Sequence, residues 1–145
     1  MGIVVAVLTA KGGTGKTTTA VNLARGLGHR LAHEGKGDDV VIIDCDPQGN
    51  AGDYCGAHDF MYHPERNPEG ACLSRVLKGE MAAMDALVGV RENVWLLPAT
   101  PALNDAVEEI AIISATQAAR GRRSESLRDV FKRRLGPLAR QARFV

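Results

Sequence analysis

Residues 11–18 combine glycines, lysines and threonines in a pattern suited to holding phosphate. The run reads Lys11-Gly12-Gly13-Thr14-Gly15-Lys16-Thr17-Thr18. The P-loop pattern G-x-x-x-x-G-K-[ST] is matched at Gly15, Lys16 and Thr17, with Ala10 in place of its first glycine. Glycines let successive backbone N–H groups converge on a phosphate without a Cβ in the way. We therefore predict a nucleotide-phosphate site, in which Lys16 reaches the β- and γ-phosphates and Thr17 holds Mg²⁺. The alternative is a glycine turn with a purely structural role.

Lys11 places a second lysine in the same loop, which an ordinary P-loop lacks. It is either a second phosphate ligand, in its own site or across a dimer interface, or a lysine that simply faces solvent.

Two carboxylates, Asp44 and Asp46, follow the apolar run 40–43. Side chains two residues apart on a strand point the same way. If this strand is a parallel neighbour of the one that leads into the phosphate loop, both carboxylates lie beside that loop. There they can order the Mg²⁺ shell and position an attacking water. The alternative is a plain Asp-Pro turn at Asp46 and Pro47.

The elements that must position these groups alternate between strand and helix. Unbroken apolar runs predict buried parallel strands at 3–8, 40–43 and 93–97. Helical spacing predicts helices at 16–34, 71–78, 81–88, 103–120 and 124–135, the last ending before Gly136-Pro137. Residues 47–70 predict a long loop. The order strand, helix, strand over 3–43 is a βαβ unit, so the fold class is α/β.

Composition favours one globular domain over residues 1–145. The chain is 45% hydrophobic, 24% charged and 4% aromatic, which excludes a disordered or fibrous chain. Its three cysteines show no metal-ligand spacing, and no leader or membrane span is evident, so we expect a cytoplasmic protein.

Charge is distributed unevenly along the chain. The net charge of +1 conceals a body, 1–119, of −6 and a segment, 120–145, of +7. Such a segment either binds an anionic partner or is a solvated arginine-rich helix face.

These motifs carry a family resemblance. Residues 11–18 resemble the deviant Walker A motif of the ParA/MinD family of ATPases. The stretch Asp44-Cys45-Asp46-Pro47-Gln48-Gly49-Asn50 is similar to the next motif of the ParA branch, which partitions plasmids and chromosomes. The run Leu96-Leu97-Pro98-Ala99-Thr100 and the basic helix after it also resemble that branch. The resemblance implies a P-loop NTPase-like, three-layer α/β/α fold with a mainly parallel sheet.

The resemblance also implies roles for individual residues and a set of partners. Lys11 would reach phosphates of the partner's ATP in a sandwich dimer, while Lys16 and Thr18 would bind phosphates of its own site. Asp46 would orient the hydrolytic water, and Asp44 would hold a water on the Mg²⁺ bound to Thr17. The implied cofactors are ATP and Mg²⁺. The implied partners are a second copy, a ParB-type centromere-binding protein and nonspecific DNA through 120–145, with a nucleoid association and no membrane.

One departure from the family bears on turnover. Family members are roughly twice as long, and in them a helix like 124–135 leads into a strand that ends in the Walker B aspartate. We expect this chain to be a partial domain that stops before that strand and leaves one side of the sheet open. Two further functions therefore stay open: a nucleotide-binding interaction module without turnover, which modulates a longer partner, and a MinD-like positioning ATPase.

Overall fold

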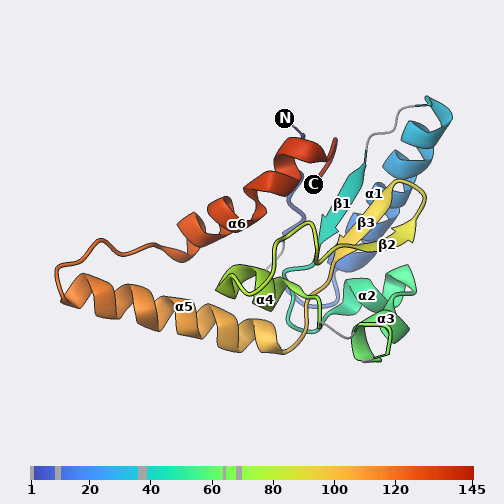
Figure 1. Cartoon of the computed structure of the whole chain (residues 1–145). Coiled ribbons are helices and arrows are strands. Elements are labelled where there is room, and N and C mark those ends of the chain that lie inside the picture. Colours follow the sequence, from blue (N-terminus) through green and yellow to red (C-terminus); the bar gives the residue numbers. More distant parts are fainter. Residues whose placement is uncertain (1, 9–10, 36–38, 64, 68–69) are drawn as a thin grey trace.

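A sheet lies between two layers of helices in the computed structural model (Figure 1). The structure describes residues 2–8, 11–35, 39–63, 65–67 and 70–145. The strands are β1 (Val40–Ile43), β2 (Val88–Arg91) and β3 (Val94–Leu97). The helices are α1 (Lys16–His33), α2 (Asn50–Cys55), α3 (His58–Tyr62), α4 (Leu73–Lys78), α5 (Ala102–Ala119) and α6 (Leu127–Gln141). The predicted strands at 40–43 and 93–97 and the helices at 16–34, 71–78 and 103–120 are confirmed within two residues.

The sheet has the order β1-β3-β2. β1 runs parallel to β3, with Val40 opposite Val94 and Ile43 opposite Leu97. β2 and β3 form an antiparallel pair joined through Asn93, whose φ of 56° lies in the left-handed region that asparagine tolerates. The parallel pair therefore forms through a crossover, as the alternating pattern predicts.

Alternation along the strands divides the apolar side chains between two layers. Val40 and Ile42 face α1 and α2, together with Ala24 of α1. Val41 and Leu97 face α4, α5 and α6 on the other side. The predicted three-layer α/β/α architecture is thus confirmed.

The prediction of a central buried strand at 3–8 is wrong. The segment 2–8 makes one isolated parallel bridge, Ile3 to Phe144, and its Ile3 N–H donates to the Arg143 carbonyl at 2.9 Å and its Val5 N–H to the Val145 carbonyl at 2.8 Å. Within these described residues it forms no regular strand, and Leu8 is 87% exposed. It is not the direct neighbour of β1, because Phe144 bridges both Ile3 and Val40 and so lies between them. Ile3, Val4 and Val5 are 46–66% exposed, so this apolar run is not covered on both faces as a central strand would be.

Two loop and helix predictions are also wrong. Residues 47–70 contain the short helices α2 and α3 in place of an uninterrupted loop. Ala51 and Cys55 of α2 are buried against α1, which supplies the apolar contact that a six-residue helix needs. Residues 81–88 form turns that lead into β2, because Met81 and Ala83 pack against the α4 layer without a helical ladder.

The helix predicted at 124–135 extends further than expected. α6 passes through Pro137 and ends at Gln141, because Leu138 in its last turn is almost fully buried and holds that turn on the core. It begins later too: Ser126 accepts a hydrogen bond from the Asp129 N–H, and Asp129 accepts one back from the Ser126 N–H. This capping box fixes the first turn.

Candidate functional site

The glycine loop leads directly into α1. Gly13 and Gly15 have φ values of 70° and 80°, in the left-handed region that glycine enters without strain. A Cβ added at Gly12, Gly13 or Gly15 would meet nothing within 4 Å, so the loop leaves open space above its backbone. Inside the loop, the Thr14 hydroxyl donates to the carbonyl of Lys11 at 3.1 Å. Ala10, which stands at the first glycine of the P-loop pattern, lies outside the described residues.

The first turn of α1 presents free N–H groups to the same space. Gly15 is the N-cap and supplies no side-chain acceptor, and no acidic residue lies in the first turn. The first N–H groups of an α-helix lack intrahelical partners, and they carry the positive end of the helix dipole. The ammonium of Lys16 lies beside the loop as well, so this end of α1 is suited to an anion such as phosphate.

Asp44 is the most constrained carboxylate of the site. It follows β1 and is only 9% exposed. Its Oδ1 accepts the Asp46 N–H at 3.0 Å, and its Oδ2 accepts the Ala51 N–H at 3.1 Å. Burial raises the pKa of Asp44 above its usual range, although these two hydrogen bonds act in the opposite direction. Asp44 therefore ties the end of β1 to the first turn of α2.

Asp46 closes a turn at the start of α2. Its Oδ1 accepts the Gln48 N–H at 3.0 Å, and its carbonyl accepts the Gly49 N–H at 2.9 Å. Gly49 has a φ of 66°, and a Cβ there would lie 2.7 Å from the carbonyl oxygen of Ala99. An Asp-Pro turn at this position therefore does not exclude a pair of carboxylates, because the turn itself holds Asp46 next to Asp44.

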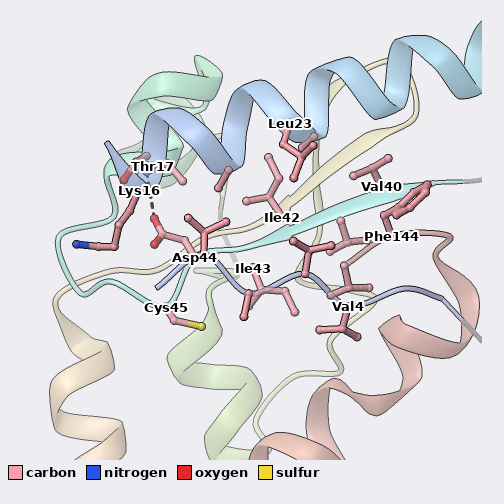
Figure 2. Close-up of a pocket in the computed structure, with 18 of the residues that line it drawn as sticks. Val4, Lys16, Thr17, Leu23, Val40, Ile42, Ile43, Asp44, Cys45 and Phe144 are labelled. Atoms are coloured by element: carbon pink, nitrogen blue, oxygen red, sulfur yellow. Dashed lines mark hydrogen bonds between the residues drawn. The ribbon is translucent and has the colours of Figure 1, made fainter. Parts of the chain in front are cut away.

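A cavity of about 510 Å³ brings the two predicted parts of the site together. Lys16, Thr17, Asp44 and Asp46 line it, and Figure 2 shows Lys16, Thr17 and Asp44 at one end. Aliphatic side chains line the remainder between the segment 2–8 and β1, including Val4, Leu23, Ile42 and Ile43.

The oxygen donors fit Mg²⁺. A threonine hydroxyl and a carboxylate are hard ligands of the kind Mg²⁺ takes, and this ion keeps several waters of its own. Among the described residues, no three His, Cys, Asp or Glu side chains gather closely enough to form a cage for a metal. A site of Thr17 plus a water held by Asp44 requires no such cage.

Two predicted phosphate ligands occupy the exposed side of the loop. Lys11 is exposed, and its carbonyl also accepts from the Lys16 ammonium at 3.5 Å. Thr18 is exposed in the first turn of α1. Neither lines the cavity, so both lie where a ligand or a second molecule approaches from outside.

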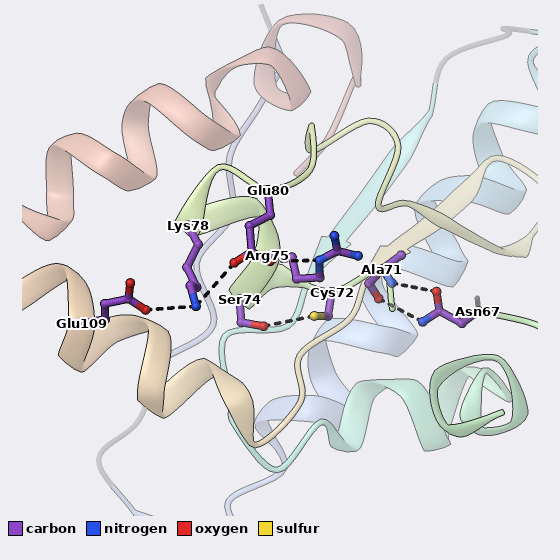
Figure 3. Close-up of polar contacts among 8 residues, drawn as sticks. All are labelled: Asn67, Ala71, Cys72, Ser74, Arg75, Lys78, Glu80 and Glu109. Carbon is purple, nitrogen blue, oxygen red and sulfur yellow. Dashed lines mark hydrogen bonds and ion pairs between the residues drawn. The ribbon is translucent and has the colours of Figure 1, made fainter. Parts of the chain in front are cut away.

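The sequence did not point to the polar contacts at the two ends of α4. Figure 3 shows the buried Asn67, whose side chain accepts the Ala71 N–H at 2.7 Å and donates to the Ala71 carbonyl at 3.4 Å. Lys78 at the end of α4 pairs with Glu109 of α5 at 3.0 Å and with Glu80 at 3.4 Å. The ion pair of Lys78 with Glu109 joins α4 to α5, and the Asn67 bonds hold the chain just before α4. An isolated asparagine between two prolines carries no sequence signal that predicts such bonds.

Not every arginine of the basic segment 120–145 is free to contact an anionic partner. Arg133 pairs with Glu125 through two hydrogen bonds of 2.8 and 2.7 Å. The Arg134 guanidinium packs against Gly79, and its Nε is buried without a partner among the described residues. Arg122, Arg123, Arg128 and Lys132 are exposed.

Comparison with known proteins places this site in a family. The family described as "AAA domain" matches residues 2–135, which is most of the chain. The chain belongs to this family. Its relatives identify it as a ParA/MinD-type member, as its motifs predict. It is 36% identical over 120 residues to maintenance of carboxysome distribution protein A of Synechococcus elongatus, covering 83% of this chain and 42% of that protein. It is 40% identical over 109 residues to the chromosome-partitioning ATPase Soj of Thermus thermophilus, covering 74% of this chain and 36% of that protein.

A solved structure agrees on the fold. Cobyrinic acid a,c-diamide synthase from Mycobacterium smegmatis, with a bound ATP analog and magnesium, matches with a TM-score of 0.75 and 27% identity. The match covers all of this chain and 50% of that one. This family member thus spans half or less of the length of the relatives described. Among its described residues, none of the helices is both long and apolar enough to cross a membrane.

Proposed function

We propose that this chain binds Mg-ATP and acts as a ParA-type ATPase in plasmid or chromosome partition. The observation that carries the proposal is the meeting, at one end of one cavity, of Lys16 and Thr17 from the start of α1 with Asp44 from the end of β1. The two relatives differ in cargo, one named for carboxysome distribution and the other for chromosome partitioning, whereas the solved neighbour was crystallised with an ATP analog and magnesium. The nucleotide site is therefore the better supported half of the proposal.

In this proposal each residue has one task. The N–H groups of the glycine loop and the Lys16 ammonium bind the phosphates, and Thr18 supports the α-phosphate. The Thr17 hydroxyl would hold Mg²⁺, and Asp44 would orient a water bound to it. Bound Mg²⁺ supplies charge neutralisation at the phosphates. Asp46, fixed by its bond to the Gln48 N–H, positions the water that attacks the γ-phosphate.

Lys11 acts in an ATP-dependent homodimer in this proposal. Its exposed position on the loop suits contact with the phosphates bound by the second copy. The dimer binds nonspecific DNA through 120–145, and a ParB-type protein stimulates release. We place the protein in the cytoplasm, associated with the nucleoid and not with a membrane.

Nucleotide titration with matched variants tests the site. We expect Mg-ATP binding by calorimetry to weaken at least tenfold in Lys16→Ala, since a charge-assisted phosphate contact is worth at least about 1.4 kcal/mol. Thr17→Ala should lose the Mg²⁺ dependence of binding. Thr19→Ala, three residues after Lys16 and exposed, is the control and should bind as the parent chain does. Equal affinity of Lys16→Ala and Thr19→Ala would refute the site.

Phosphate release distinguishes the proposal from its alternative. Release that Asp46→Ala abolishes, with binding retained, supports an ATPase. Binding with no release supports a nucleotide-binding interaction module without turnover. The cavity beside the site is the observation that favours this second function, because its mostly aliphatic lining suits contact with another protein.

The DNA contact has a separate test. Charge reversal at the exposed Arg122, Arg123, Arg128 and Lys132 should weaken binding to duplex DNA and flatten its salt dependence. Reversal of the exposed Arg25 and Arg66, outside this segment, is the control. The contact is refuted if both sets of reversals leave the same affinity and the same slope against salt.

A further inference from the structure

α5 has one face inside the molecule and one face that no other described part of the chain covers. Leu103 and Ala106 are buried, and the helix packs on α4 and α6 through that side. The opposite face repeats at three- and four-residue spacing and is exposed throughout; it consists of Asp105, Glu108, Ile112, Ala115 and Ala119. Figure 1 shows α5 at the margin of the molecule, reaching well beyond the sheet. We call these five residues the outer face of α5.

Exposed apolar surface lies at the middle of this helix. Ile112 is 58% exposed and the adjacent Ile113 is 48% exposed. Residues 110–119 contain no charged side chain, which is uncommon for a solvated helix face. A helix that leaves such a stretch in water gains free energy by burying it against another apolar surface.

The charges at the two ends of α5 have opposite signs. Asp105 and Glu108 precede the uncharged stretch, and Arg120, Arg122 and Arg123 follow it. Glu109 is already engaged by Lys78 at 3.0 Å, as Figure 3 shows. Neither Glu108 nor Arg120 has an ion-pair partner within the described parts of the chain. An acidic partner would match only one end of this pattern, and a basic partner only the other.

We propose that the outer face of α5 binds the same face of a second copy in an antiparallel helix pair. A pair centred on residue 114 places Glu108 opposite Arg120, the C-cap residue of α5, twice by symmetry. The same register sets Ile112 opposite Thr116 of the second copy, next to the small side chain of Ala115. The pattern is thus complementary to itself when reversed, which is what a two-fold interface requires.

The interface is small, so the dimer is weak. Eighteen residues of helix span about 27 Å, and one such pair lies at the lower end of specific interface sizes. We expect association at tens to hundreds of micromolar protein. It requires no nucleotide, does not involve Lys11 and lies on a different element from the phosphate site, so it stands independently of the proposed function.

Charge-reversal variants test the pairing in sedimentation equilibrium without nucleotide. Glu108→Arg and Arg120→Glu should each lose at least tenfold in dimer affinity, because like charges then face each other twice. An equal mixture of the two variants should associate again, because the arginine introduced into one copy meets the glutamate introduced into the other. Recovery only in the mixture is a result that a change in folding cannot produce.

Apolar substitution gives the second arm. Ile112→Lys should reduce association, whereas Met84→Lys, an exposed apolar residue outside α5, should not. Far-UV circular dichroism confirms that each variant is folded. The proposal is overturned if the parent chain stays monomeric up to millimolar concentration, if Glu108→Arg associates as well as the parent, or if the mixture does not recover.

Discussion

Replacing Asp44 by alanine should destabilise the fold, because this carboxylate holds two backbone N–H groups in place. The Ala51 N–H is buried, and leaving it without an acceptor costs about 1–3 kcal/mol. The Asp46 N–H is only partly buried, so water can replace its acceptor at a cost of about 0.5–1.5 kcal/mol. Removing a carboxyl whose pKa is raised by burial offsets part of this loss. The net expected loss is about 1–3 kcal/mol.

Urea unfolding at pH 7, followed by circular dichroism, measures this loss of free energy of unfolding. In thermal unfolding of a chain of 145 residues, a loss of this size lowers Tm by roughly 3–10 °C. Asp46→Ala is the matched control, since it removes one hydrogen bond in an exposed turn and should cost less than about 1 kcal/mol. If Asp44→Ala were as stable as the parent chain, or more stable than Asp46→Ala, the reasoning that Asp44 ties β1 to α2 would be wrong.

Three further predictions concern stability. Gly49→Ala should lower the free energy of unfolding by more than about 2 kcal/mol, because its φ is positive and its Cβ would lie 2.7 Å from a backbone oxygen. The control is Gly35→Ala, which also has a positive φ but has open space around its Cβ, and it should lose about 1 kcal/mol. Equal losses would refute the steric argument. Ser126→Ala should cost about 1 kcal/mol through the lost capping box, measured by thermal unfolding against Ser124→Ala, which lies before the helix; similar Tm values for the two variants would count against it. The pKa of Asp44 is raised in the folded state, so its contribution to the free energy of unfolding is present below its ordinary pKa of 3.8 and is lost as pH rises through the folded-state pKa. The parent chain should therefore lose stability relative to Asp44→Asn between pH 4 and 7, measured by urea unfolding. A gain in stability over that range would contradict the shift.

Much of the fold follows from local patterns in the sequence. The β-branched run 40–43 forms a strand because both its faces are covered, by α1 on one side and by the α4 layer on the other. The glycines of 11–18 predict the open loop because only glycine enters positive φ freely. The candidate site was predictable for the same reason, since its loop and its two carboxylates lie next to elements with strong periodic signals.

The errors arise where distant contacts decide the structure. The run 3–8 reads as a buried strand, but its pairing depends on Phe144, 141 residues away from Ile3, and no local pattern reports that distance. α6 continues through Pro137 because Leu138 is buried, so tertiary packing overrides the usual effect of proline. The indole of Trp95 is partly exposed and donates to Asp39 at 3.0 Å, a contact between distant residues that its strand pattern does not report.

Hydrogen exchange with and without Mg-ATP tests the central claim most directly. We predict slower exchange of the backbone amides of residues 12–18 when Mg-ATP is added, because these N–H groups hold the phosphates, with no such protection in Lys16→Ala. Protection elsewhere in the chain, with residues 12–18 exchanging at an unchanged rate, would contradict the assignment of the nucleotide site.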